Sequence, residues 1–520
     1  MKRKPILLLV LSPLLLISLG GCLKWNNSSS TTSSSSNDGD DWATTSSCGD
    51  CENVQPEYLK LWNPTTRVNI SIKMSQQAAE FINQYQSDHN NSTYFDYYVP
   101  CDVVITLNDN TYTFEEVGIR QKGNMSRTTI LVGNNLSLNS LGHYKLSFKQ
   151  TFDGDEYTNI EALRPFKKVW DDSSARKARK NRTLFDMEKI DIKWNRNDDE
   201  TKVKQSYALK LFRENGVLAA HSTLANINMQ IDEKTPINTT YEVFECIDES
   251  FIKKHFSAND ASGDLYKCTY TDRGPANFSN SYTVGNQIGV EDNTTNYHPV
   301  YDLKTNKKKN TTHTDLKNLR SMINDKTSSA EQYKTNIEQY LDMTSFMRYE
   351  SIAYLLGNFD DMRNNANNYY LYIPNSSKKA YIIPYDFDRC LGTGCEGRKD
   401  YMTDFSPEST KMQCNNGWQN INLYWRTVCS TTESGSGYAN VERVEAYRAM
   451  YQKNIETLIN NRIISNESFT SYVNSFPEEY RGNPNGAGDN NITFSNYLSK
   501  KIQAIKDSNT KGLINYEINV

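Results

Sequence analysis

Three aspartates at the two ends of a predicted β-hairpin are the residues of this chain best suited to chemistry. Asp360 precedes a predicted strand over Tyr369–Ile373, and Asp386 and Asp388 directly follow a second one over Ala380–Tyr385. Mg²⁺ prefers hard oxygen ligands, usually one or two carboxylates completed by water and substrate phosphates. Phosphoryl transfer also uses a further carboxylate that orients the attacking hydroxyl. The pattern therefore predicts metal-dependent phosphate chemistry at this hairpin.

The loop before the hairpin is rich in asparagine, including Asn365 and Asn368. Asparagine and aspartate are common in turns, where their side chains bond to the local backbone, and this explains any single one of them well. Acids at the end of an apolar strand are costly to bury without a partner. The whole set of acids and amides is therefore better explained by a site than by turns.

The first residues have the pattern of a bacterial lipoprotein signal. Basic residues 2–4 precede an apolar run over Ile6–Leu19, and Leu19-Gly20-Gly21-Cys22 follows. The apolar run is shorter than the roughly 20 residues of a membrane span and ends in small residues, so a transmembrane anchor is less favoured. We expect residues 1–22 to be a signal peptide with Cys22 lipidated, which places the protein outside the cytoplasm on a lipid anchor.

Residues 23–57 are dominated by Ser, Thr, Asn and Gly. Such a composition buries too little apolar surface to order the chain, so we expect a disordered tether. Cys48 and Cys51 near its end are better explained by a local disulfide than by a redox or zinc site. The 58 basic and 62 acidic residues of the chain nearly cancel, so its charge indicates no nucleic-acid partner.

The remaining chain is long for one core and divides by predicted element type. Residues 58–246 hold most of the predicted strands, and residues 247–520 are mainly helical around the acidic hairpin. One strand, Tyr144–Lys149, alternates and places Lys145 on one face. A lysine on a strand facing a cleft binds nucleotide phosphates in kinases, although spacing alone favours an exposed lysine. A β-rich lobe, a short link and a helical lobe with acids is the layout of a kinase.

Short motifs spread from about Arg67 to Cys395 resemble the CotH family, the spore-coat protein H kinases. In chain order these are Gly118–Asn124 (GIRQKGN), Tyr144–Phe148 (YKLSF), Tyr241–Glu245 (YEVFE), Leu265–Lys267 (LYK), Tyr301–Thr305 (YDLKT), Gly357–Asp360 (GNFD), Asn367–Tyr372 (NNYYLY) and Pro384–Asp388 (PYDFD). Each motif is short, but together and in this order they are specific.

The resemblance implies an α+β, atypical protein-kinase-like fold with two lobes, a β-rich N-lobe over 58–246 and a mainly helical C-lobe over 247–520. It implies ATP-dependent transfer of phosphate to Ser or Thr of an unknown protein substrate, with Mg²⁺ or Mn²⁺. The residues it assigns are catalytic Asp360, metal-binding Asp386 and Asp388 with Asn365 or Asn368, Lys145 on the phosphates, Arg120, Lys122 and Gly123 in the phosphate loop, and Glu245 and Lys267 beside the hinge.

Two positions depart from the family pattern. Many relatives have Arg-Gly where this chain has Lys122-Gly123, which keeps the charge but loses the planar fork of arginine. Many have Trp before the metal-binding acid, where this chain has Tyr385. Neither change removes a reactive group, so they bear on substrate preference more than on activity.

Two alternatives remain open at this point. The first is a catalytically inactive kinase-like fold acting as a surface binding protein or adhesin, which would bind nucleotide without transferring phosphate. The second is a metal-dependent hydrolase or carbohydrate-binding protein, which would bind metal without any nucleotide effect on stability. The sequence also leaves open whether phosphate or a nucleotide is transferred.

Overall fold

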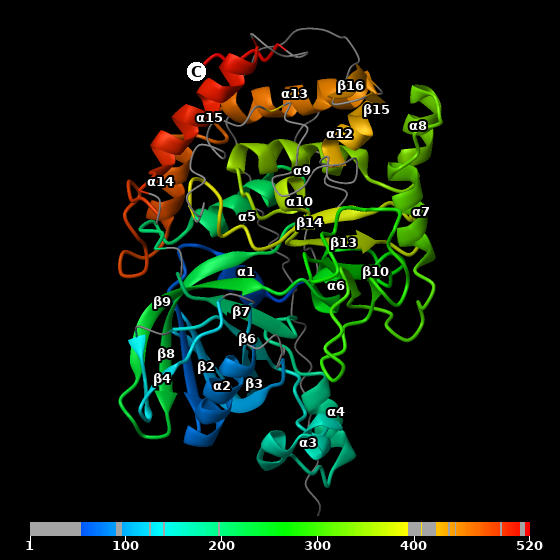
Figure 1. Cartoon of the computed structure of the whole chain (residues 1–520). Coiled ribbons are helices and arrows are strands. Elements are labelled where there is room, and N and C mark those ends of the chain that lie inside the picture. Colours follow the sequence, from blue (N-terminus) through cyan, green and yellow to red (C-terminus); the bar gives the residue numbers. More distant parts are fainter. Residues whose placement is uncertain are drawn as a thin grey trace, which may run out of the picture. The chain divides into compact units, whose positions relative to one another are not determined.

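The computed structural model describes residues 54–89, 96–123, 126–138, 141–195, 198–393, 407, 423–434, 437–442, 444–488, 491–509 and 515–520 (Figure 1). They belong to one compact unit that begins at Ala43. The predicted signal peptide with Cys22, and the tether as far as residue 53, lie outside the described residues. Helix α1 (Pro56–Trp62) begins just inside the predicted tether, because proline suits the first position of a helix and Tyr58 and Leu61 are buried.

Seven strands close into a barrel. In spatial order they are β1 (Val68–Met74), β2 (Val99–Leu107), β3 (Asn110–Gln121), β6 (Tyr144–Ser147), β7 (Lys189–Lys193), β9 (Ile237–Glu245) and β8 (Ser222–Ile231). All neighbours are antiparallel except β1 and β8, which run parallel and close the ring.

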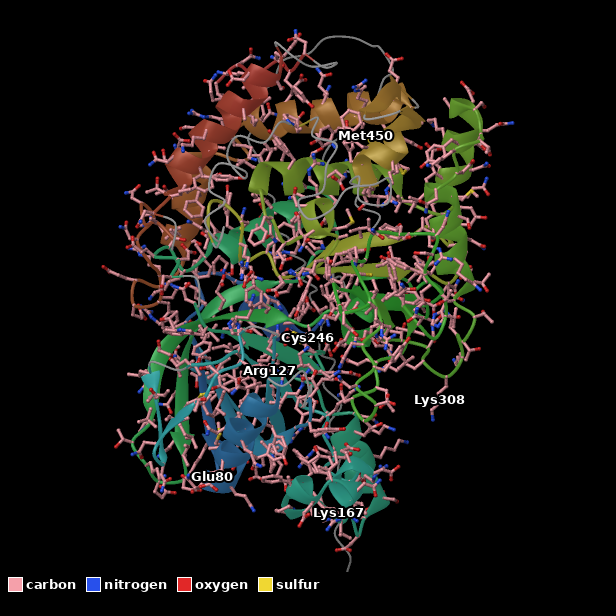
Figure 2. All side chains as sticks on the ribbon, viewed as in Figure 1. Glu80, Arg127, Lys167, Cys246, Lys308 and Met450 are labelled. Atoms are coloured by element: carbon pink, nitrogen blue, oxygen red, sulfur yellow. The ribbon has the colours of Figure 1, made fainter. Side chains whose placement is uncertain are left out.

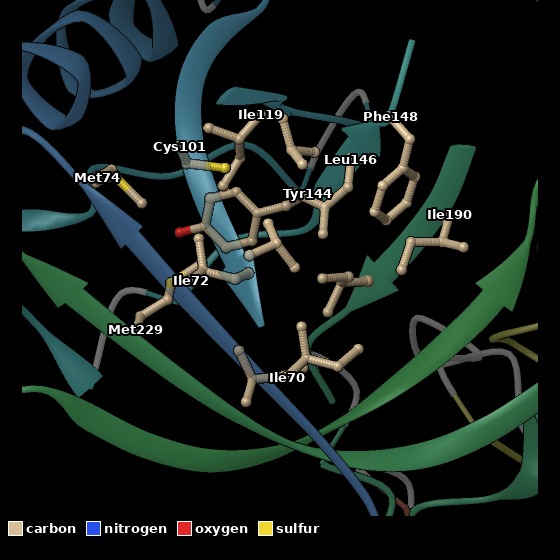
Figure 3. Close-up of a cluster of buried hydrophobic side chains, with 14 of the residues drawn as sticks. Ile70, Ile72, Met74, Cys101, Ile119, Tyr144, Leu146, Phe148, Ile190 and Met229 are labelled. Atoms are coloured by element: carbon tan, nitrogen blue, oxygen red, sulfur yellow. The ribbon is translucent and has the colours of Figure 1, made fainter. Parts of the chain in front are cut away.

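The barrel interior is filled by alternate residues of its strands. Ile70 and Ile72 of β1, Leu146 of β6 and Ile190 of β7 are all at most 1% exposed and pack together (Figure 3). This alternation follows from the two-residue period of a strand. The residues that alternate with them on the same strands therefore point to the outer face of the barrel.

Short elements lie between the barrel strands. They are α2 (Gln76–His89), β4 (Leu131–Val132), β5 (Asn135–Leu136), α3 (Glu156–Asn159), η2 (Glu161–Phe166), α4 (Ser173–Lys180) and α5 (Lys204–Glu214). Helix α4 covers a basic stretch of the chain. Asp172 caps it by accepting a hydrogen bond from the backbone of Ser174.

A second sheet contains the predicted hairpin. Its order is β11 (Ile288–Gly289), β12 (Tyr301–Leu303), β10 (Asp264–Cys268), β13 (Tyr369–Ile373) and β14 (Tyr381–Pro384). Strands β13 and β14 are antiparallel, which confirms the hairpin. β13 also pairs with β10, from a distant part of the chain. Residues 246–248 connect this region to β9, and Figure 2 labels Cys246.

The rest is mainly helical. The helices are α6 (Glu249–His255), α7 (Thr314–Ile323), α8 (Ala330–Ile337), α9 (Met343–Leu356), α10 (Met362–Asn365), α12 (Leu423–Val428), α13 (Glu445–Asn460), α14 (Asn466–Ser475) and α15 (Phe494–Ser508), with a small hairpin of β15 (Cys429–Ser434) and β16 (Gly437–Glu442). Helix α13 follows β16 closely and ends before Arg462, which has a positive φ of 58°.

Helix α9 positions the acidic loop. Nearly all its residues are buried, and it packs against α5, α13 and β14. Gly357 ends it with φ of 60°, a left-handed conformation that glycine adopts without strain. The loop with Asp360 starts there. The molecule is thus a mixed α+β protein, and none of its described helices has the length and apolar character needed to cross a membrane.

Candidate nucleotide and metal site

Charged side chains line up across the outer face of the barrel. Strand register places Arg120, Lys145, Asp191 and Phe244 side by side on β3, β6, β7 and β9. Lys193 lies two residues after Asp191, and side chains two apart in a strand share a face. One face of the barrel therefore presents several cations around Asp191.

Asp191 is the buried centre of this face. Its carboxylate lies 2.5 Å from Nζ of Lys122 and 3.3 Å from Nζ of Lys145, and it accepts a hydrogen bond from Sγ of Cys246 at 3.3 Å. Burial by itself would raise the pKa of Asp191, but Lys122 and Lys145 hold it well below its usual value. An ionised Asp191 keeps both ammonium groups at one place, where they can face phosphate oxygens.

Lys193 connects the barrel to the acids of the hairpin. Its ammonium group contacts Asp386, lies 3.3 Å from Oδ2 of Asp388, and donates to Oε1 of Gln205 at 2.9 Å. Burial would lower the pKa of Lys193, but the two aspartates raise it above its usual value, so the ammonium stays charged. Lys193 and Asp386, which are 193 positions apart in the sequence, thus belong to one ion-pair cluster.

Asp386 and Asp388 lie just beyond β14 and remain open to solution, with side chains 31% and 32% exposed. Asp386 has a left-handed backbone with φ of 58°, and the amide of Asn358 donates to its carbonyl oxygen at 3.3 Å. Lys193 lowers the pKa of Asp386 against the effect of burial, whereas burial raises the pKa of Asp388. The pair offers carboxylate oxygens to a cation from solution.

Asp360 is held by three amides. Asn365 and Asn367 donate to its Oδ1 at 2.7 and 3.0 Å, and Asn368 donates to its Oδ2 at 3.0 Å. Burial raises the pKa of Asp360, and these hydrogen bonds oppose the rise. The backbone N–H of Asp360 also donates to Oδ1 of Asn358 at 3.3 Å, which connects this loop to Asp386.

The carboxylate and amide oxygens of this region suit a hard divalent cation. Besides the two carboxylates, Oδ1 of Asn365 is buried and accepts no hydrogen bond from the described residues. The amide of Asn368, by comparison, donates to both the carbonyl and the carboxylate of Asp360. A buried acceptor without a hydrogen-bond donor can serve as a cation ligand, and this feature distinguishes Asn365 from Asn368.

The residues predicted to form the phosphate loop lie at and just beyond the end of β3. Gly123 has φ of 91°, and a Cβ atom there would lie 1.9 Å from Oγ of Ser126, so only glycine fits. Lys122 also lies 5.3 Å from the ring of Tyr385, and Lys267 of β10 lies 5.6 Å from the same ring. Burial lowers the pKa of Lys267. The structure thus brings Lys122, Gly123, Lys145 and Lys267 to one region.

Arg120 and Glu245 have other partners. Arg120 donates to Asp96 at 2.7 Å, which binds the segment before β2. Glu245 is only 3% exposed and interacts with Tyr58, His221 and Lys254. Its side chain points away from the face that carries Phe244, because neighbours in a strand alternate. The structure therefore does not bring Glu245 to the cluster around Asp191.

Sequence reasoning missed Asp191 and Lys193. Both lie on β7, within Lys189-Ile190-Asp191-Ile192-Lys193, where charged and apolar residues alternate strictly. That alternation is a strand signal. It would have placed both charges on one face, although only the tertiary structure shows what they meet.

A polar pocket lies behind Lys193, lined by residues that include Gln205, Glu242 and Asp388. Oε1 of Glu242 accepts two hydrogen bonds from Ser206. The backbone N–H donates at 3.2 Å and the hydroxyl donates at 2.7 Å. Burial raises the pKa of Glu242 to about 7. Its carboxyl group is therefore partly protonated at neutral pH.

We expect Glu242→Gln to stabilise the protein above pH 7. Glu242 titrates near 4.5 when unfolded and near 7 when folded, so its ionisation costs stability as pH rises through this window. Glutamine avoids that cost, and the gain should be about 1–3 kcal/mol at pH 8 and close to zero at pH 4. Urea unfolding at both pH values measures it. An equal effect at both pH values would show that folding does not shift the pKa of Glu242.

Comparison with known proteins agrees with this geometry. Residues 119–507 match the family described as CotH kinase protein, which is more than half of the chain. The chain belongs to the CotH kinase family. The resemblance noted from the short motifs is thereby confirmed, and this CotH-family chain is a kinase-like protein.

One solved structure matches this chain at low identity. The crystal structure of a Helicobacter pylori proinflammatory kinase CtkA is 10% identical to this chain, covering 61% of this chain and 88% of that one with a TM-score of 0.29. The match is too loose to carry an argument about this CotH-family protein. No curated protein sequence matches the chain.

Proposed function

We propose that this CotH-family protein is an ATP-dependent protein kinase that transfers the γ-phosphate to Ser or Thr of a protein substrate. The observation that carries the proposal is the meeting of Lys193 with Asp386 and Asp388, next to the loop of Asp360. We also propose that the barrel and the second sheet with its helices act as the two lobes of a kinase-like fold.

The cations of the site would bind the polyphosphate. Lys122 and Lys145 both form ion pairs with Asp191. Lys267 of the second sheet lies near the ring of Tyr385, as Lys122 does. Asp191 is the one acid in this group of side chains, so the group carries a net positive charge. Such fixed cations stabilise the charge that develops during phosphoryl transfer.

Asp386, Asp388 and Asn365 would hold Mg²⁺ or Mn²⁺, which neutralises phosphate charge when bound. Lys193 already lies between these aspartates and the barrel, so it is placed to bind phosphate oxygens beside them. Asp360 would accept a hydrogen bond from the acceptor hydroxyl and orient it. The three amides around Asp360 fix its carboxylate for that task.

We further propose that the protein acts outside the cytoplasm, attached through a lipid on Cys22. The signal-like residues 1–22 support this, together with the tether that follows them. Labelling cells with a radioactive fatty acid would test it. Label on the wild-type protein and none on Cys22→Ser is the expected result, and equal labelling of both would refute the lipid anchor.

The activity is tested by incubating the full chain with Mg²⁺ or Mn²⁺, a Ser/Thr-rich acceptor protein, and ATP labelled on either the α- or the γ-phosphate. Label from the γ-phosphate alone is the expected result. Label from the α-phosphate would replace phosphate transfer by nucleotide transfer. A thermal shift with ATP and no label would instead support a kinase-like binding protein.

A further inference from the structure

Two histidines and a glutamate converge where the barrel connects to the second sheet. His221 directly precedes β8, Glu245 ends β9, and His255 ends α6. One nitrogen or oxygen ligand atom from each lies within 4.8 Å of the other two. The two imidazole rings stack at 6.4 Å with 15° between their planes. Three segments of the chain thus bring metal-ligand side chains to one place.

All three groups have the protonation state that binds a metal at neutral pH. Burial lowers the pKa of His255 to about 4 and also lowers that of His221, so both rings are neutral. Burial would raise the pKa of Glu245, but His221 and Lys254 hold it below its usual value. Two neutral imidazoles and a carboxylate are ligands that zinc accepts.

One pair of candidate ligands has close to the spacing that a shared ion needs. Nδ1 of His221 lies 3.2 Å from Oε2 of Glu245. Two ligands at zinc bond lengths and a tetrahedral angle are about 3.3–3.5 Å apart. The hydroxyl of Tyr58 lies 3.0 Å from the same Nδ1 and donates to Oε1 of Glu245 at 2.9 Å. Tyr58, or a water beside it, can complete the coordination.

Two cations face the cluster and set how the ion must bind. Nζ of Lys254 lies 3.2 Å from Oε1 of Glu245. Arg213 lies close enough to lower the pKa of His221 and His255. Because Lys254 and Tyr58 occupy Oε1, the ion would use Oε2, and the nearby positive charges would make the affinity lower than at an all-anionic site.

We propose that His221, Glu245 and His255 form a zinc site that ties α6 to the ends of β8 and β9. The site goes beyond the proposed kinase activity, because Glu245 points away from the cluster around Asp191. The family resemblance by itself would place Glu245 at the nucleotide. The zinc site gives this residue a different role. An ion bound there would stabilise the folded chain by binding it in preference to the unfolded one.

The test uses the full chain, stripped with a chelator and titrated with Zn²⁺ and, separately, with Co²⁺. We expect one equivalent of metal, a tetrahedral Co²⁺ absorption spectrum without thiolate charge-transfer bands, and a melting temperature that rises with Zn²⁺. His255→Ala and the bulkier His255→Leu should each raise the Kd for Zn²⁺ by more than about 100-fold.

His298→Ala is the matched control. His298 lies 3.2 Å from Oε1 of Glu291, the same kind of pair as His221 and Glu245, but this pair lacks a third ligand among the described residues. Its variant should bind zinc like the wild type. The proposal is overturned if the wild type binds no stoichiometric metal, if both His255 variants keep the affinity, or if thiolate bands show that cysteines, such as Cys48 and Cys51, bind the ion instead. These readouts are independent of kinase activity.

Discussion

Asp386→Ala should lower phosphate transfer by about 10³-fold or more, because it removes a carboxylate of the proposed metal site at the point where phosphate charge develops. The variant should also lose the thermal shift that ATP and Mg²⁺ give the wild type. Lys193 keeps Asp388 and Gln205 as partners, so the fold should persist. Label from γ-labelled ATP and melting curves measure the two effects.

Two controls accompany this variant. Asp315→Ala removes a carboxylate that pairs with Lys378 on the surface at 2.9 Å, and its activity should equal that of the wild type. A chelator added to the wild type should reproduce the loss seen in Asp386→Ala. If Asp386→Ala kept more than a tenth of the wild-type rate, the metal would have to be held elsewhere.

Asp360→Ala should lower kcat by about 10²–10⁴-fold, the usual contribution of a group that accepts a proton from the acceptor. The fold should remain, since the lost partners are the amides of Asn365, Asn367 and Asn368 at a partly open loop. In contrast to Asp386→Ala, this variant should keep the thermal shift with ATP and Mg²⁺, because the role proposed for Asp360 is to orient the acceptor and not to bind the nucleotide.

Asp361→Ala separates this role from a structural one. Asp361 is completely buried and caps α10 by accepting a hydrogen bond from the backbone of Asn364 at 2.8 Å. Changing it should lower the melting temperature while leaving the rate per folded molecule nearly unchanged. A large loss of stability in Asp360→Ala, with normal turnover by its folded fraction, would contradict a catalytic Asp360.

Several features of the site could be read from the chain because they are local. Asp386 and Asp388 follow the last residues of a short apolar strand, and Asp360 opens the loop before its partner strand. A hairpin joins neighbouring segments, so its register and its ends follow from short-range pattern. The family motifs are local for the same reason, and they carried the recognition.

The tertiary structure decided which charges meet. Lys193 reaches Asp386 across 193 residues, and Asp191 gathers Lys122 and Lys145 from two other strands, only because the barrel closes in one register. Closure also points Glu245 away from this face and toward His221 and His255. Strand pattern indicates which residues share a face of one strand, whereas the partners of that face depend on pairing between distant strands, which short-range pattern does not determine.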